Sequence, residues 1–573
     1  MKQAKEIAVI VVLLAAILVL VVAIMSTGET AVPTLAAPLS PTELIPTPTS
    51  VPLPPNDAGP TAPPAADAQT PETVLANCRY GATPVFDVAD NIPWLTTIGA
   101  GWFLTFGPNK PAVTPANDAR FVPVLRVNEE LSGETFTGVW YVGGKNGPAA
   151  KTYVQNLVAT QPGALWLVGN EIDRLTQDEI TPAVYARAYH DIYGWIKVAD
   201  PTAQVAISGL VEVTPARLWY LDEVWNSYQA LYGTPMPVDV WNMHIYIINE
   251  LLYDGQPGAA HIPVGFNPAS HPEIVLKRLS DLSNPNAKEM CADPDIYCYA
   301  EHDDMGIFAE QVVAMRAWMK AHGQQNKPLI LSEYSLLWPY ETFSNGACDF
   351  LIDERGNCFD PVRVSTFMVN TFNYLENTKD ANLGYPLDDN RLVQQWMWFS
   401  LYVPHETETE PAYPGAASNL LNQGYTALTP MGTTFRNYVA AQPVKRNLLV
   451  TQVAHPLVYT NGGGTTSATL SVYFKNNGNT AVTTPFNVTF YSDAAMTNVI
   501  GATTYTPKVE GCAMVTYESL SIQWNNLAPG AHPFWVKIDT SGIVFETNEN
   551  DNVGTGMVLV DPAAQAFLPT ILR

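Results

Sequence analysis

Short apolar runs alternate with longer amphipathic stretches along residues 76–443. Continuous apolar runs are typical of strands buried on both faces, and apolar residues spaced three and four apart indicate helices between them. Thr181 and Pro182 provide a cap and a first-turn proline for a helix over residues 182–198, and another helix is expected over 308–322. The expected strands are 101–106, 121–127, 137–142, 164–169, 204–208, 238–247, 328–331 and 393–400.

This order of elements predicts an α/β fold in which the strands close into a parallel (β/α)8 TIM barrel over residues 76–443. The strand at 137–142 is the least well defined. After residue 443 the helical spacing ends, and short alternating strands such as 468–474, 486–491 and 533–538 are separated by Gly, Asn and Pro. Residues 444–562 are therefore predicted to form an all-β immunoglobulin-like sandwich, followed by a tail at 563–573.

Residues 1–27 are predicted to form a membrane anchor. An apolar run of 19 residues, 7–25, follows Lys2 and Lys5, and at about 1.5 Å per residue it spans about 28 Å, close to the hydrocarbon thickness. The lysines favour a cytoplasmic N-terminus, so the bulk is expected outside the cell at its surface. A cleaved signal peptide, and hence secretion, is the alternative. Residues 28–75 contain twelve prolines and are predicted to be an extended linker.

The charge balance argues against one class of function. The chain has 54 acidic and 29 basic residues and a net charge of −25, which repels phosphate backbones, so no nucleic-acid partner is expected. Only 14% of residues are charged although 47% are apolar, which is compatible with packed domains and a polar, uncharged surface. A monomer is expected.

Six cysteines fit an oxidising compartment: Cys78, Cys291, Cys298, Cys348, Cys358 and Cys512. Cys291 and Cys298 lie seven residues apart, and Cys348 and Cys358 lie ten apart. Each pair is therefore expected to bridge a loop, with metal binding as the alternative. Cys78 and Cys512 have no predicted partner.

In a parallel barrel the residues just past the C-terminal strand ends surround the active site. Glu171 follows the run 164–169 and Glu333 follows 328–331, and glycoside hydrolysis needs such a pair of carboxyls on rigid elements. Taken singly, Glu171 also fits the first turn of a helix and Glu333 a solvated loop. The other residues at strand ends are Arg126, Asn170, His244, Tyr246 and Trp398. Taken singly, Arg126 also fits a pair with a barrel acid and Asn170 a helix cap. His244 also fits a hydrogen-bonded core histidine, and Trp398 a side chain that fills the barrel.

Taken together, these residues resemble the clan of retaining (β/α)8 glycoside hydrolases. The resemblance implies that Asn170 and Glu171 end the fourth strand, with Glu171 as acid/base, and that Glu333 ends the seventh as nucleophile. It places Arg126 after the second strand, His244 with Tyr246 after the sixth and Trp398 after the eighth, as substrate-binding residues.

Within the clan, the segments FVPVLRV, LWLVGNEID, VDVWNMHIYI and KPLILSEY are most similar to the fungal cell-wall endo-β-1,3-glucanase family. Two departures leave the sugar and linkage open: Ile172 stands where that family has proline, and SEY replaces TEF. The resemblance implies a polysaccharide substrate and no cofactor or metal. A catalytically silent barrel that binds glycan is the alternative.

The mechanism implies a charge pattern for the two carboxyls. An acid must be protonated near neutral pH, so the pKa of Glu171 is expected to be raised by partial burial and by the nearby Glu333. Glu333 is expected to stay ionised beside Arg126 and Tyr246.

The C-terminal domain has a resemblance of its own. SVYFKNNGNTAVTTPFNVTFYSD, LAPGAHPFWVKID and FETNENDN are similar to the CARDB module of bacterial surface proteins, which implies a spacer or an adhesion and carbohydrate-contacting domain.

Overall fold

The computed structural model describes residues 75–248, 250, 260–274, 302–337, 360–404, 415–460, 464–514 and 517–562. The predicted anchor, the linker up to residue 74, the two predicted loop disulfides and the tail at 563–573 lie outside these residues. No helix within the described ranges is long and apolar enough to cross a bilayer.

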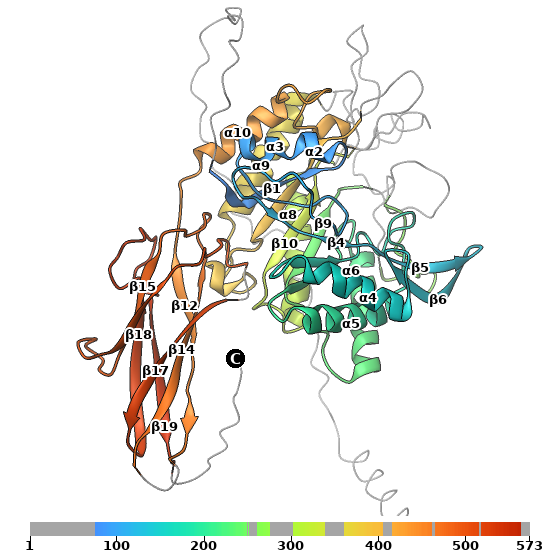
Figure 1. Cartoon of the computed structure of the whole chain (residues 1–573). Helices are drawn as coiled ribbons and strands as arrows, with labels where there is room; N and C mark the ends of the chain where they lie inside the picture. The colour runs from blue at the N-terminus through green and yellow to red at the C-terminus, as the bar shows by residue number, and fades with distance from the viewer. Residues whose placement is uncertain are drawn as a thin grey trace, which may run out of the picture. The chain divides into compact units, whose positions relative to one another are not determined.

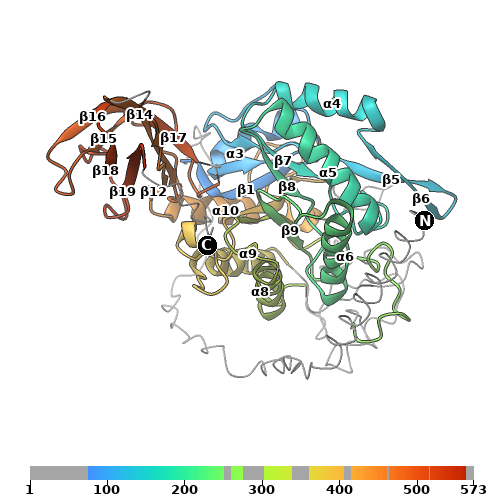
Figure 2. The same cartoon turned by 90° about the horizontal axis from the view of Figure 1, so that it is seen from below.

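Eight parallel strands close into a barrel (Figures 1 and 2). Hydrogen bonding joins one set in the order β9-β10-β11-β1-β2-β3 and a second set in the order β4-β7-β8, where β3 and β4 are two halves of the same strand. A bridge between Ala206 and Val240 links the two sets on the other side. Pro123 divides the third strand into β3 and β4, because proline donates no ladder hydrogen bond. The predicted barrel is therefore confirmed. The strands are β1 (Asn77–Pro84), β2 (Ala100–Phe103), β3 (Arg120–Phe121), β4 (Val124–Leu125), β7 (Leu165–Val168), β8 (Gln204–Ile207), β9 (Trp241–Ile245), β10 (Leu329–Tyr334) and β11 (Gln395–Tyr402).

Helices form the outer layer of the barrel (Figure 2). As predicted, Thr181 precedes a helix that begins at Pro182, and the second expected helix is present with bounds shifted by up to three residues. β2 is followed by the irregular segment 104–119 instead of a helix. The helices are α2 (Val88–Asn91), α3 (Pro93–Ile98), α4 (Gly147–Ala159), α5 (Pro182–Ala199), α6 (Pro215–Tyr232), α8 (Met305–Ala321), α9 (Pro361–Asn377) and α10 (Pro430–Ala441), with short 3-10 turns at Pro386–Asp388 and Ala416–Ser418.

One predicted strand is wrong and one real strand is missing from the prediction. The segment expected at 137–142 belongs to β6 (Thr135–Val142), which pairs antiparallel with β5 (Val127–Ser132) in a hairpin between β4 and α4. The true first strand is β1, where Asn, Arg, Gly and Pro interrupt the apolar residues. Arg126 consequently follows the third strand and not the second, whereas Glu171 and Glu333 keep the fourth and seventh positions.

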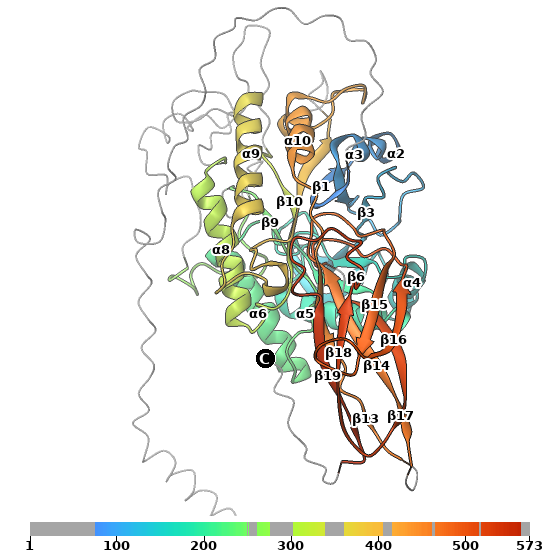
Figure 3. The same cartoon turned by 90° about the vertical axis from the view of Figure 1, so that its left-hand side faces the viewer.

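The C-terminal domain is the predicted β-sandwich, whose strands lie alongside one another in Figure 3. Its two sheets enclose a core that includes Phe474, Phe490 and Phe534, all fully buried. One sheet has the order β12 (Leu448–Val453), β14 (Thr466–Asn476), β17 (Glu518–Leu527). The other has the order β13 (Leu457–Val458), β19 (Val553–Val560), β18 (Gly530–Ile538), β15 (Phe486–Tyr491), β16 (Val499–Tyr505).

The sandwich completes the interior of the barrel. Cys512 and Met514 are buried in the same cluster as barrel residues such as Trp102 and Leu165. A disulfide joins Cys512 to Cys78 at the start of β1, across 434 residues of sequence. These are the two cysteines for which the sequence offered no partner. Because Cys78 lies at the N-terminal end of its strand, the sandwich segment covers the barrel end opposite the strand C-termini.

This packing predicts that the two domains stabilise each other. Replacing Cys78 and Cys512 together by Ser is expected to lower the free energy of unfolding by about 2–5 kcal/mol. Met514→Ala, with the disulfide intact, is expected to cost a similar amount because it leaves a cavity in the barrel interior. Calorimetric melting of both variants measures this. Melting temperatures within about 1 °C of the parent in both would show that the contact contributes little.

Candidate active site

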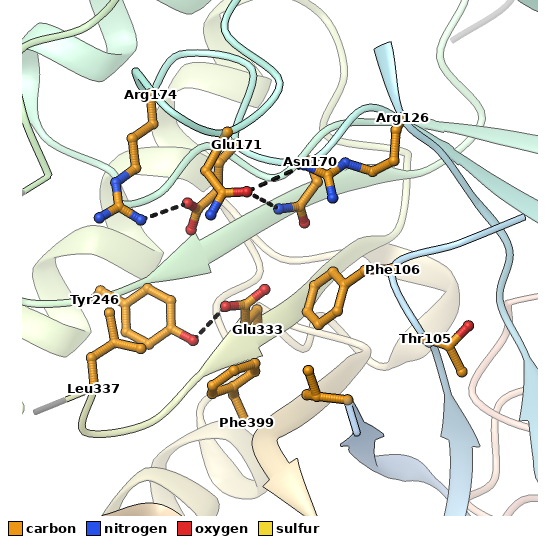
Figure 4. A pocket seen from close by; sticks show the side chains of 12 residues that line it. Thr105, Phe106, Arg126, Asn170, Glu171, Arg174, Tyr246, Glu333, Leu337 and Phe399 are labelled. Atoms are coloured by element: carbon orange, nitrogen blue, oxygen red, sulfur yellow. Dashed lines mark hydrogen bonds and ion pairs between the residues drawn. The ribbon is translucent and has the colours of Figure 1, made fainter. Parts of the chain in front are cut away.

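A pocket with a cavity volume of about 330 Å³ opens at the C-terminal ends of the barrel strands (Figure 4). Seven of the eight strands contribute to it, either from their last residues or from the loop that follows them. Its lining brings together Glu171, Glu333, Arg126, Asn170 and Tyr246, which are five of the seven predicted site residues. The other lining residues are Val85, Thr105, Phe106, Arg174, Gln177, Leu337 and Phe399.

A tight turn after β7 directs Glu171 into this pocket. Gly169 has φ +95°, and a Cβ there would come within 2.5 Å of Ile172. Glu171 itself has φ 46°, a left-handed conformation that costs a non-glycine residue free energy and is common at functional sites. Its backbone N–H donates to the carbonyl of Gly209 at 3.0 Å, which fixes the turn against the end of β8.

The two carboxyls face a shared buried space. Glu171 is 2% exposed and Glu333 is 7% exposed. One oxygen of each carboxyl and a ring nitrogen of His244 all lie within 4.8 Å of one another. Among the described residues these three side chains form the group whose ligand atoms are close enough to hold a metal ion.

Each carboxyl has a donor of its own. Arg174 donates to one oxygen of Glu171 at 3.2 Å, and Tyr246 donates its hydroxyl to Oε1 of Glu333 at 2.7 Å (Figure 4). His244 lies beneath the pair, with Nδ1 3.2 Å from Glu171 Oε1 and 3.8 Å from Glu333 Oε2. His244 does not line the pocket and is 1% exposed, so a sugar in the pocket would meet the two carboxyls and not the imidazole.

Two neighbours fix the imidazole of His244. Its Nε2 lies 3.0 Å from the hydroxyl of Ser332. A Cβ on Gly209 would lie 2.3 Å from the ring, so only glycine at this position leaves room for it.

The charge pattern of the pair is the reverse of the predicted one. Burial acts to raise the pKa of Glu171, but the hydrogen bond from His244 and the charge of Arg174 outweigh it and lower the pKa to about 2. Burial raises the pKa of Glu333 to about 7, with His244 opposing and the charge of Glu171 reinforcing the rise. These opposite directions favour an ionised Glu171 beside a protonated Glu333 in the free site.

Arg126 does not contact Glu333 as predicted; it forms an ion pair with Asp178. The second oxygen of Asp178 accepts the backbone N–H of Val127 at 2.8 Å and that of Asn170 at 2.9 Å. Burial raises the pKa of Asp178 to about 6, although Arg126 and these N–H groups oppose the rise. Asp178 therefore clamps the end of the third strand to the end of the fourth.

Trp398 lies outside the pocket, contrary to its predicted role. It is fully buried, donates its indole N–H to the carbonyl of Ser418 at 2.8 Å, and packs against Tyr334 and Phe372. Because strand side chains alternate between faces, the neighbouring Phe399 faces the pocket instead. Trp102 in β2 is likewise buried, inside the barrel.

Sequence reasoning did not single out Arg174, Gln177, Asp178 or Phe106. Phe106 lies three residues after the end of β2, so the strand-end rule that found the other residues applies to it as well. The first three lie in the loop after β7, where their contacts depend on the turn at Glu171.

Comparison with known proteins gives one family match. Residues 447–556 match the CARDB family model. The predicted CARDB-like module is thereby confirmed. No curated protein sequence is a significant match.

Solved structures similar to the chain include two GH128 endo-β-1,3-glucanases. The subgroup II enzyme from Sorangium cellulosum is 14% identical, with 64% of this chain and 99% of that chain covered and a TM-score of 0.37. The subgroup I enzyme from Amycolatopsis mediterranei, in complex with laminaritriose, is 14% identical, with 63% and 98% covered and a TM-score of 0.35. A CARDB domain from Pyrococcus furiosus, in complex with di-metal ions, is 23% identical, with 21% and 97% covered and a TM-score of 0.17.

The clamp predicts a specific loss of stability. Asp178→Asn removes the charge that pairs with Arg126 and one acceptor of the buried N–H groups, and should lower the free energy of unfolding by about 1–3 kcal/mol. Gln177→Ala is the matched control, because Gln177 contacts the same arginine at 3.3 Å from a less buried position. Urea denaturation of both variants measures the difference, and equal effects would contradict the clamp.

The raised pKa of Glu333 predicts a pH-dependent difference in stability. Between the ordinary value of 4.5 and about 7, the folded protein holds a proton that the unfolded chain lacks. The stabilisation from this proton is complete below the lower value and is lost as pH rises through the upper one. The free energy of unfolding of Glu333→Gln, relative to that of the parent, should therefore rise by roughly 1–3 kcal/mol as the pH increases from 4 to 8.

Melting temperatures of parent and variant across this pH range measure the gain. Glu273→Gln, at an exposed glutamate, is the control and should show no such trend. A constant difference between Glu333→Gln and the parent would show that Glu333 is ionised throughout.

Proposed function

We propose that the protein is a glycoside hydrolase that cleaves an extracellular β-linked polysaccharide with retention of configuration. The observation that carries the proposal is the approach of Glu171 and Glu333, whose nearest oxygens lie within 4.8 Å in a buried pocket at the barrel mouth. Carboxyls about 5–5.5 Å apart are typical of retaining enzymes, whereas inverting enzymes keep them about 6.5–9.5 Å apart to admit a water.

The roles follow the strand positions that the clan resemblance implies. Glu333, after the seventh strand, attacks the anomeric carbon while Glu171, after the fourth, protonates the leaving oxygen. This gives a covalent glycosyl ester on Glu333 and releases the first product. Glu171 then removes a proton from water, which attacks the same carbon and frees Glu333. Asn170, in the pocket wall beside Glu171, is placed to hydrogen-bond the sugar.

The resting charges require one additional event before reaction. The shared proton resides on Glu333 in the free site, whereas the first step needs it on Glu171. Arg174 and His244 are the groups that hold the pKa of Glu171 low. A sugar that displaces Arg174 from Glu171 removes one of these two effects. It also brings its anomeric carbon next to Glu333. Substrate binding therefore favours transfer of the proton to Glu171.

The sequence resemblance favours β-1,3-glucan as the first substrate to test. We further propose that the enzyme acts outside the cell, at its surface if the apolar segment 7–25 stays attached. The alternative function is a barrel that binds glycan without cleaving it, and it predicts no product release from any polysaccharide.

Product release from β-1,3-glucan, xylan, mannan and galactan should be measured with the full chain and with Glu333→Gln and Glu171→Gln. We expect one polymer to be hydrolysed and both variants to lose about 10³-fold or more of that activity. Glu130→Gln, at an exposed glutamate of the β5–β6 hairpin, is the control and should retain activity. Binding of one glycan by all four proteins without cleavage would establish the binding protein instead.

The roles of the two carboxyls are separated by azide. Glu333→Ala with azide should form a glycosyl azide of inverted configuration, because azide occupies the space of the lost nucleophile. Glu171→Ala should keep cleaving aryl glycosides, whose leaving groups need no proton, and with azide should give the retained product. The reverse pattern would assign the nucleophile to Glu171, in line with the resting charges.

A further inference from the structure

We propose that the catalytic pocket is also a binding site for a divalent transition-metal ion of the zinc class, which occupies the space between Glu171, His244 and Glu333 and competes with the sugar. Metal binding itself does not rest on the proposed hydrolase function; only the competition does.

The first argument is the spacing of the ligand atoms. Zinc bonds carboxylate oxygen and imidazole nitrogen at about 2.0–2.2 Å, so tetrahedral ligands lie about 3.4 Å apart. Nδ1 of His244 lies 3.2 Å from Glu171 Oε1 and 3.8 Å from Glu333 Oε2, and the three ligand atoms all fall within 4.8 Å of one another. The two distances from His244 are therefore within about 0.4 Å of the spacing that a tetrahedral zinc site requires.

The second argument is an unpaired acceptor. Oε2 of Glu333 is buried and has no hydrogen-bond partner, although Oε1 of the same carboxyl accepts from Tyr246. A buried oxygen without a partner becomes costly once the carboxyl ionises, and this oxygen lies 3.8 Å from Nδ1 of His244. A cation bonded to this oxygen would give it a partner.

The third argument is that the surrounding groups leave these atoms available. Arg174 binds the other oxygen of Glu171 and Tyr246 binds the other oxygen of Glu333 (Figure 4). On the far side of the imidazole, Ser332 lies 3.0 Å from Nε2. Its hydroxyl can accept the Nε2 proton, so that Nδ1 presents a lone pair and its proton leaves to solvent. Such a partner on the second nitrogen is usual for histidine ligands.

Three protein ligands in a pocket open to solvent leave a fourth position for water. This position lies where a sugar would meet the two carboxyls. Bound metal would therefore exclude substrate and hold both carboxyls in the ionised form, so the pocket would be inactive until the metal is removed.

Calorimetric titration of the full chain with Zn²⁺ tests binding without any need for activity. Glu333→Gln and His244→Gln should each weaken binding at this site by about 100-fold or more. His271→Gln, in a partly exposed histidine–glutamate pair remote from the pocket lining, is the matched control and should bind as the parent does. Zinc binding that is unchanged in Glu333→Gln and His244→Gln, or absent from the parent, would overturn the proposal.

A spectroscopic readout protects the test against misfolded variants. Co²⁺ added to the parent should give the intense visible absorption of a four- or five-coordinate ion, and Zn²⁺ should displace it. The weak absorption of six-coordinate Co²⁺ would overturn the site. If a glycan is hydrolysed, Zn²⁺ should inhibit competitively and EDTA should restore the rate; binding without competition would place the ion elsewhere.

Discussion

Two carboxyls whose nearest oxygens lie within 4.8 Å of each other in a buried pocket cannot both carry a full charge without a large electrostatic cost. The site is arranged around this constraint. Arg174 and His244 favour the charge on Glu171, while Glu333 has one neutral donor and one oxygen without a partner. The pair therefore holds one proton, which is what a double-displacement hydrolase requires, although the free protein carries it on the residue expected to attack. The same arrangement makes the pocket suitable for a cation.

The barrel provides the rigidity that this arrangement needs. Glu171 and Glu333 come from different strands, and Glu333 lies in register with His244 on the neighbouring one. Glycines at 169 and 209 allow close approaches that a side chain would prevent. Asp178 ties the ends of the third and fourth strands together. Each functional group is thus held by main-chain contacts as well as by its own hydrogen bonds.

Sequence patterns predicted the barrel, the sandwich and the two carboxyls because short apolar runs, alternating strands and strand-end positions are local signals. These patterns did not predict features that depend on what packs against both faces of a strand. Trp396, Met397, Trp398 and Phe399 are all buried, so apolarity alone cannot tell which side chains face the pocket. β1 was missed because its polar residues interrupt the apolar run, and their burial depends on partners far away in the sequence. Arg79, for example, donates to Asp388 across 309 residues. The charges on Glu171 depend on Arg174 and His244, whose positions a linear pattern does not contain.

The packing of Met514 and Cys512 inside the barrel bears on the order in which the chain can fold. β1 leaves the ribosome early, whereas the residues that cover its end of the barrel are made more than 430 positions later. Until then the floor of the barrel exposes apolar side chains such as Trp102 and Leu165. Contacts of such long range slow folding, and exposed apolar surface invites aggregation. The nascent barrel must therefore remain incomplete until nearly the whole chain has been synthesised, and a chain that stops before the sandwich lacks part of the barrel core.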